Sequence, residues 1–110
     1  MPPAGRASLL RGWAEFFGSH DLVLAPIATA PAFPVGADLD PAGAGAFLTA
    51  MRMTVIVNFL GLPAAAVPVP GDGFPQAVQL IGPRYREDLR LDGASAIERE
   101  LGAPTPIDPR

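Results

Sequence analysis

The sequence predicts an α/β fold in which helices pack on a small mixed sheet, with an antiparallel hairpin and a final helix toward the C-terminal end. Periodicity, strand-forming runs and turn composition lead to this prediction. Apolar residues recur at helical spacing in residues 7–18 and again in 86–101. Two runs of strand-forming residues, 64–69 and 76–81, lie between them. The segment that joins these runs is rich in glycine and proline, as turns are.

The N-terminal part of the chain predicts a helix followed by a strand. The helix is expected over residues 7–18, with Gly18 as its C-cap. Its apolar residues form one wide face, which favours a place in the core over a ligand platform: Leu9, Leu10, Trp13, Phe16 and Phe17. Residues 21–26 are expected to form a short strand that Pro26 ends. Their continuous apolar run, 22–24, is typical of a strand covered on both faces.

The middle of the chain predicts a loop and then an interrupted helix. Residues 29–45 contain three prolines and three glycines, which favours an irregular loop that acts as a lid or a wall. Residues 46–59 have helical spacing. The β-branched cluster 54–57 weakens this helix and favours a break near Met53. Gly61 is expected to cap the helix or to turn the chain.

The C-terminal part predicts a hairpin and one more helix. Residues 64–69 read as a strand of small residues, and Pro68 favours an edge position or a bulge. Residues 76–81 supply the antiparallel return strand. The last helix is expected over 86–101, with carboxylates in its first turn, and residues 103–110 as an extended tail. Its predicted apolar stripe comprises Leu91, Ala94, Ile97 and Leu101.

The composition bounds the class of protein. A chain of 110 residues forms one domain at most, and 49% hydrophobic against 17% charged residues is apolar for this size. We interpret the excess as surface that packs against a missing partner, although abundant alanine is an alternative. The net charge of −3 and the lack of a basic run argue against nucleic acid. No apolar run approaches ~18 residues, which argues against a membrane span. The absence of cysteine fits a reducing, cytoplasmic location.

A series of motifs in a fixed order resembles the C-terminal end of amidase signature enzymes. This family includes bacterial amidases and the A subunit of the glutamyl-tRNA amidotransferase. The resemblance runs from about Leu9 to Leu101 and matches roughly the last quarter of a family member, so it implies that 1–110 is one partial amidase domain. Ala77 stands where family members usually carry glycine. The motifs are Asp21-Leu-Val-Leu-Ala-Pro26, Asn58-x-x-Gly61-Leu-Pro-Ala64, Val67-Pro68, Gly73-x-Pro75-x-x-x-Gln79 and Glu87-Asp88-Leu89.

The resemblance implies hydrolysis of carbon–nitrogen amide bonds by a serine nucleophile, a bridging serine and a lysine base. This chain contains no lysine, and an arginine guanidinium stays protonated and cannot act as the base. Its serines, Ser8, Ser19 and Ser95, have ordinary explanations as helix caps or helix-surface residues. A Ser19, His20 and Asp21 triad fails on geometry, because adjacent side chains cannot form the required relay. We therefore assign no catalytic residue, no metal and no cofactor, and we predict no activity from this chain alone.

The resemblance leaves this segment a supporting role. It implies a contribution to the substrate-pocket wall, for which Arg52, Thr54 and Asn58 are the candidates. Arg52 would meet a substrate carboxylate, and the other two would offer hydrogen bonds. The structural alternative is a solvated or paired Arg52 and an Asn58 that satisfies backbone groups at the turn. The expected partner is the remainder of the amidase domain or a complementing chain, with a small-molecule amide as substrate of the complete enzyme. The competing hypothesis is a small non-catalytic α/β module.

Overall fold

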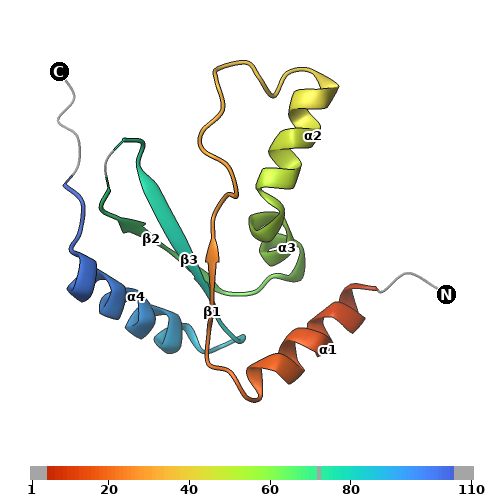
Figure 1. The fold of residues 1–110 in the computed structure, drawn as a ribbon. Helices are drawn as coiled ribbons and strands as arrows, with labels where there is room; N and C mark the ends of the chain where they lie inside the picture. The colour runs from red at the N-terminus through yellow and green to blue at the C-terminus, as the bar shows by residue number, and fades with distance from the viewer. Residues whose placement is uncertain (1–4, 72, 106–110) are drawn as a thin grey trace.

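The computed structural model describes residues 5–71 and 73–105, which fold into four helices and a three-stranded sheet (Figure 1). The order of these elements confirms the α/β fold expected from the sequence. The predicted tail has no regular structure through residue 105, and its last residues, 106–110, lie outside the described part. In chain order the elements are α1 (Arg6–Phe17), β1 (Val23–Pro26), α2 (Pro41–Ala50), α3 (Arg52–Leu60), β2 (Ala64–Val69), β3 (Gln76–Ile81) and α4 (Glu87–Leu101).

The strands lie in the order β1-β3-β2, and both pairings are antiparallel, where a mixed sheet was expected. The hairpin of β2 and β3 has the predicted bounds. Its register places Ala64 opposite Ile81 and Val69 opposite Gln76. Because β2 lies at an edge of the described sheet, Pro68 is tolerated there despite its missing N–H donor.

The central strand β3 divides its side chains between two layers of helices, since neighbouring residues of a strand point to opposite faces. Ile81 is completely buried and packs with Ala25 and Val57 on the side of α1 and α3. The adjacent Leu80, 5% exposed, points to the other face and contacts the position of Gly93 in α4. Figure 1 shows α4 on one side of the sheet and α1 and α3 on the other. The sheet is therefore the middle layer.

The first two elements are less covered than the sequence predicted. No residue of α1 is fully buried, although Trp13 and Phe17 pack against the core, and Phe16 is 41% exposed. The prediction that β1 is covered on both faces is wrong for this chain, because Leu24 is 64% exposed. Leu24 pairs with Leu80 on the face that α4 covers, but α4 packs mainly over β2 and β3, so this residue of the edge strand β1 stays largely open.

The loop between β1 and the central helices is shorter than predicted. The sequence assigned Gly43 and Gly45 to this loop, but both lie inside α2. Pro41 occupies the first turn of α2 and the Asp40 side chain accepts a hydrogen bond from the Gly43 N–H at 2.6 Å, which is a favourable helix start. The interruption falls at Met51 instead of near Met53, and it bends the two helices by 71°.

Among the described residues no single helix is long and apolar enough to cross a membrane. The successive helices α2 and α3 reach the necessary length and composition only together, as a bent pair.

The C-terminal end of α3 is fastened by arginines from distant parts of the chain. Arg6 donates from Nε to the Phe59 carbonyl at 2.9 Å and from Nη2 to the Leu60 carbonyl at 3.1 Å. Arg84 donates to the same Leu60 carbonyl at 3.0 Å. Gly61 ends the helix in the left-handed region, with φ of 66°, as expected for a C-cap glycine. These bonds join α1 and the segment after β3 to one helix end.

The helix α4 has nearly the predicted extent, and its predicted apolar stripe is correct in part, because Ala94 and Ile97 are half-buried. Leu91 and Leu101, assigned to the apolar stripe, are 59% and 55% exposed. Arg90, which was not part of the predicted stripe, is also half-buried and donates to the Ala64 carbonyl. Gly93 lies where a Cβ atom would stand 2.9 Å from Leu22 and 3.0 Å from Leu80. A glycine here therefore permits the close approach of α4 to the sheet.

We expect Gly43→Ala to lower the free energy of unfolding by about 1–3 kcal/mol, because its Cβ would overlap the Ala37 carbonyl group. The matched control is Gly45→Ala in the same helix, where a Cβ meets nothing within 4 Å. That substitution is expected to raise the stability by about 0.5–1 kcal/mol. Urea unfolding followed by circular dichroism measures both, and equal effects of the two changes would contradict this packing.

We expect the pKa of Asp88 to lie below its ordinary value, because its carboxylate accepts hydrogen bonds from the Arg86 guanidinium at 3.0 Å. Because the pKa of Asp88 is lower in the folded chain than in the unfolded chain, the ionised carboxylate stabilises the fold at any pH above the unfolded-state pKa. This contribution is lost as the pH falls through the folded-state pKa. Arg86→Gln should raise the Asp88 pKa toward its ordinary value. Carboxyl NMR titration over about pH 2–7 measures this, and an unchanged Asp88 midpoint would refute the pairing.

Candidate functional site

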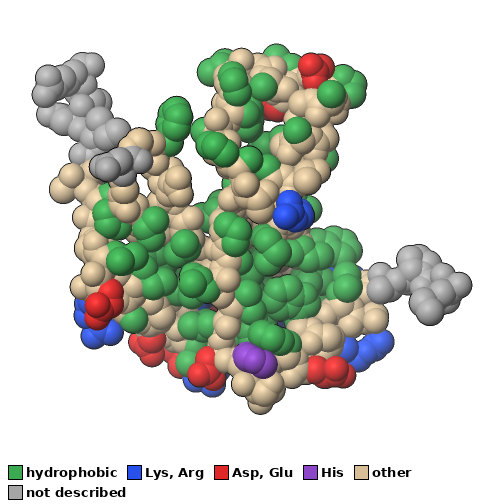
Figure 2. All heavy atoms as spheres, in the orientation of Figure 1, with side chains coloured by type: hydrophobic (Ala, Val, Ile, Leu, Met, Phe, Trp, Pro, Cys, Tyr) green, Lys and Arg blue, Asp and Glu red, His purple; other side chains and the backbone are tan. Residues whose placement is uncertain are grey.

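A groove of about 590 Å³ lies between the loop after β1, the end of α2 and the start of β3. In Figure 2 the molecule is hollowed between the β2–β3 turn and the projecting α2 segment. The lining is mainly apolar and aromatic, with polar groups from only a few side chains. Its larger and polar members include Thr29, Phe33, Phe47, Met51, Phe74 and Gln76.

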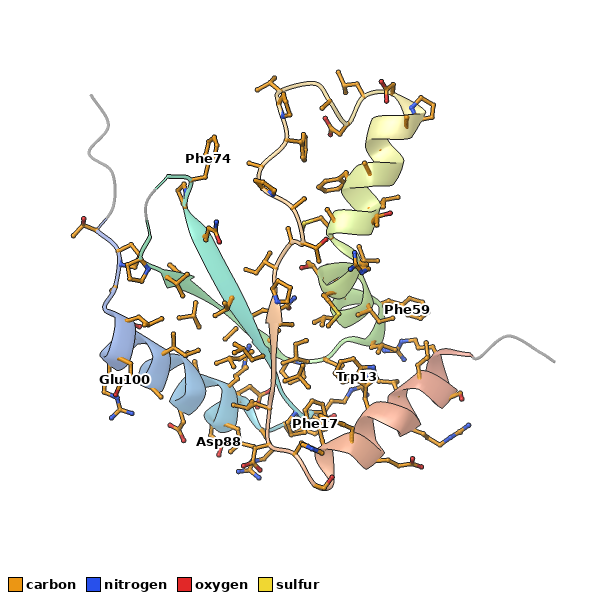
Figure 3. All side chains as sticks on the ribbon, viewed as in Figure 1. Trp13, Phe17, Phe59, Phe74, Asp88 and Glu100 are labelled. Carbon is orange, nitrogen blue, oxygen red and sulfur yellow. The ribbon has the colours of Figure 1, made fainter. Side chains whose placement is uncertain are left out.

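Local contacts fix the shape of one side of the groove. The Thr29 N–H donates to the Ala50 carbonyl at 2.9 Å, which joins the loop to the last turn of α2. The Phe33 and Phe47 rings meet edge to face, with centroids 5.4 Å apart and planes at 76°. This geometry is a preferred arrangement of aromatic pairs. The opposite side of the groove comes from Phe74, which Figure 3 shows at the turn end of the hairpin.

Arg52 and Thr54 do not line the groove, but each donates a hydrogen bond to a residue that does. Arg52 is exposed, and its Nη1 donates to the Thr49 carbonyl at 2.7 Å and to the Thr29 hydroxyl at 3.3 Å. The Thr54 hydroxyl, which is half-buried, donates to the Ile27 carbonyl at 2.9 Å. Ile27 and Thr29 both line the groove. The two predicted residues are therefore brought together on one segment of the wall.

Asn58 is not brought into this arrangement. It lies one turn beyond Thr54 in α3 and its side chain is exposed. No hydrogen bond joins that side chain to another residue in the described part of the chain, although its backbone carbonyl accepts one from Gly61 at 3.2 Å. The expected role of the side chain at the turn is therefore absent among these contacts.

Sequence reasoning missed the aromatic residues of the groove. Phe33 and Phe74 each precede a proline in a glycine- or proline-rich segment, and this was the available signal. Large aromatic side chains in exposed turns indicate a binding surface, because their contact with water contributes nothing favourable to the free energy of folding. Phe47 was assigned to a helix, but its partner Phe33 lies in the loop.

The Ser19 and His20 side chains cap the end of α1. The His20 ring stacks on Phe16 with centroids 4.1 Å apart, and its Nδ1 lies 3.1 Å from the Ser19 hydroxyl and 3.2 Å from the Phe16 carbonyl. No hydrogen bond or ion pair joins His20 to Asp21 within residues 5–71 and 73–105. The other serines lie on α1 and α4. In the same residues no three His, Cys, Asp or Glu side chains gather in a way that would hold a metal ion.

The order helix, strand, two helices, hairpin, helix forms part of an α/β domain, and its groove beside the hairpin is open rather than enclosed. A family model described as "Amidase" matches residues 4–91. Because this match covers most of the chain, the chain belongs to the amidase family.

Curated relatives agree with this family. An "Indoleacetamide hydrolase" from Bradyrhizobium japonicum is 43% identical over 90% of this chain and 22% of the relative. The A subunit of the glutamyl-tRNA(Gln) amidotransferase from Streptococcus equi subsp. zooepidemicus is 36% identical over 84% of this chain and 19% of the relative. The chain thus spans about a fifth of the length of these relatives.

Solved structures share the fold. The A subunit of the glutamyl-tRNA(Gln) amidotransferase from Thermotoga maritima superposes with a TM-score of 0.75 at 30% identity, over 87% of this chain and 21% of that protein. A 6-aminohexanoate cyclic dimer hydrolase in complex with substrate gives a TM-score of 0.67 at 28% identity, over 87% and 22% of the two chains. The fold is therefore that of a segment of amidase signature enzymes, and the sequence motifs place it at their C-terminal end.

We expect Thr54→Val to destabilise the chain by about 1 kcal/mol, because it removes the hydroxyl that donates to the Ile27 carbonyl. The matched control is Thr49→Val, which removes an exposed hydroxyl bonded to the Gly45 carbonyl within α2. That change should stay within about 0.5 kcal/mol. Hydrogen exchange supplies a second measurement, in which the Thr29 amide should exchange faster only in the Thr54 variant. Equal protection of this amide in both variants would refute the anchoring role of Thr54.

Proposed function

We propose that this chain provides the C-terminal part of an amidase that hydrolyses carbon–nitrogen amide bonds. The family match over residues 4–91 carries the proposal. Two relatives named for hydrolysis add support: the 43% identical indoleacetamide hydrolase, and the structurally similar 6-aminohexanoate cyclic dimer hydrolase. Under this proposal the nucleophilic serine, the bridging serine and the lysine base come from residues outside these 110.

The side chains that could act as nucleophile and base in this chain support the proposal that it does not hydrolyse amides by itself. A serine hydroxyl becomes an effective nucleophile only when a positioned base removes its proton. No lysine exists in the sequence, and an arginine cannot replace it because its pKa is too high. The single histidine, His20, is engaged at the end of α1. Neither a Ser–Ser–Lys nor a Ser–His–Asp arrangement can be assembled from these groups.

The segment would contribute to the substrate-pocket wall through Arg52, Thr54 and Asn58. Arg52 and Thr54 act in this proposal as positioning residues, since they hold the carbonyl and hydroxyl groups of residues 27–29. Arg52 uses one terminal nitrogen in these bonds, so its other donors are available to a carboxylate on the substrate. Asn58, exposed on α3, would offer its amide to a group outside the chain.

The shape of the chain supports a partner that covers it. Its radius of gyration is 16.3 Å, and a compact domain of this length has a value of about 13 Å. Its extents of 51 × 41 × 18 Å describe a thin slab. Apolar side chains stand on its surface, among them Leu24, Val55 and Phe59, which are 64%, 47% and 54% exposed. Such surface is typical of an interaction face.

The partner would be the remainder of the amidase domain or a complementing chain that completes a split amidase. The substrate of the complete enzyme would be a small-molecule amide, without a cofactor, nucleic acid or membrane. We assign the protein to a bacterial cytoplasm, in keeping with the bacterial relatives and the lack of cysteine. The alternative, a non-catalytic α/β module that stands alone, is disfavoured by the open shape and the exposed apolar residues.

A chimera tests the proposed function. In the Bradyrhizobium japonicum indoleacetamide hydrolase, the segment that matches this chain is replaced by residues 5–105. We expect this chimera to release ammonia from indoleacetamide, because the remainder of that enzyme brings the catalytic residues. The 110-residue chain alone should release none above the buffer.

Two controls make this result interpretable. The same hydrolase with its matching segment deleted should be inactive, and the intact hydrolase sets the full rate. Circular dichroism and the elution volume show whether the chimera folds like the intact enzyme. A chimera that folds but does not turn over contradicts the proposal, as does turnover by this chain alone.

A further inference from the structure

We propose that the turn between α3 and β2 binds a divalent oxyanion of the phosphate type through the guanidinium groups of Arg6 and Arg84. Both groups already meet at this turn, where each donates a hydrogen bond to the Leu60 carbonyl. The inference goes beyond the proposed function and does not rest on it, because neither arginine lines the groove. The turn lies at the opposite end of α3 from Arg52.

The two guanidinium groups are close enough for one anion to contact both. Their Nη2 atoms lie within 3.1 Å of the same carbonyl oxygen. A Cβ atom at Gly61 would stand 3.5 Å from the Arg6 Nη2 and 3.6 Å from the Arg84 Nη2, so the space beside this glycine touches both nitrogens. Because glycine has no side chain, that space is open to a ligand. Both arginines are exposed, which makes them accessible from solvent.

The positive charge at this turn has little compensation. The only ion pair among residues 5–71 and 73–105 joins Arg86 to Asp88, so no described carboxylate is paired with Arg6 or Arg84. The C-terminal end of a helix carries roughly half a negative elementary charge, which offsets only part of two guanidinium charges. Each guanidinium has five N–H donors and spends one or two of them on backbone carbonyls. Both charge and donors therefore remain for an anion.

A second observation comes from the segment that carries Arg84. The adjacent Tyr85 has φ of 66°, in the left-handed region that a residue with a large side chain rarely adopts. Burial of its own ring does not offset this strain, because Tyr85 is 87% exposed. Strained backbone of this kind is concentrated at ligand sites. The Gly82 N–H donates to the Pro63 carbonyl at 3.0 Å, which fastens this segment to the turn.

A surface depression of about 300 Å³ lies between this segment and the turn. Its lining residues are Gly61, Leu62, Pro63, Arg84, Tyr85 and Glu87. The Tyr85 hydroxyl supplies one more hydrogen-bond donor, whereas the Glu87 carboxylate opposes an anion. A divalent anion interacts with each of these charges twice as strongly as a monovalent one, and two guanidinium groups outnumber one carboxylate. The net attraction therefore favours phosphate over a carboxylate ligand.

NMR titration of the ¹⁵N-labelled 110-residue chain tests the inference, at constant ionic strength and about pH 7.5, where a phosphate group is largely divalent. The probes are inorganic phosphate, glycerol 3-phosphate and acetate. We expect saturable shifts with phosphate at the backbone amides of Gly61, Leu62 and Tyr85, and none with acetate at the same concentrations. Both phosphate probes binding supports the site. The tighter of the two identifies its source as the free ion or as the phosphate group of a larger ligand.

Variants locate the contacts. Arg84→Gln and Arg6→Gln should each raise the Kd for inorganic phosphate about tenfold, because each removes charge-assisted hydrogen bonds. The matched control is Arg99→Gln, which removes the same charge in the last turn of α4, roughly 18 Å along the helix from Glu87. This distance exceeds the Debye length of about 10 Å at 0.1 M salt, so the control should leave the Kd unchanged.

Glu87→Gln provides a test that leaves the arginines in place, since both of them also hold the end of α3. Removal of the opposing carboxylate should lower the Kd for phosphate about threefold. A dispersed spectrum from each variant verifies that it is folded. The absence of a saturable shift at the turn, or equal affinities for phosphate and acetate, would overturn the inference. An unchanged Kd in Glu87→Gln, or in a folded Arg84→Gln chain, would overturn it as well.

Discussion

Two guanidinium groups donate to one carbonyl oxygen, that of Leu60, from Arg6 in α1 and from Arg84 after β3. The last carbonyls of a helix have no partner within the helix, so each needs a donor from elsewhere. Because the Leu60 side chain is completely buried, this end of α3 lies at the centre of the chain. The positions of α1 and of the hairpin relative to α3 depend on these two hydrogen bonds.

The opposite end of α3 sets the groove. Thr54 holds the Ile27 carbonyl and Arg52 holds the Thr29 hydroxyl, while the Thr29 amide is bonded to the end of α2. One helix of nine residues thus connects the structural junction at Leu60 with the wall of a candidate binding site. A change in the position of this helix would alter both places. Under the proposed function, this link would let a segment without catalytic groups influence the substrate pocket.

Local features could be predicted from the sequence, and long-range ones could not. The hairpin strands were predicted to the residue because a turn-rich segment separates two short strand-forming runs. Gly61 was predicted as a cap because its role depends on neighbouring residues. The bonds of Arg6, Thr54 and Arg90 join positions 26 to 54 residues apart, which no local pattern specifies. For the site, the helix that carries Arg52 was predicted, but the direction of its side chain was not. The burial of Leu24 and Phe16 was overstated because the prediction assumed that this chain covers its own apolar faces.

The strand order has a consequence for biosynthesis. The strands β1 and β2 do not pair with each other, and each forms its ladder only with β3, the last of the three to be made. Nothing resembling the sheet can therefore assemble on the ribosome until the chain has been translated past Ile81. Until then β1 and β2 have no partner strand, and their unpaired backbone N–H and C=O groups can form hydrogen bonds with other chains. The helices between them can form earlier, since their hydrogen bonds are local. A nascent chain of this protein is consequently most vulnerable just before its central strand emerges.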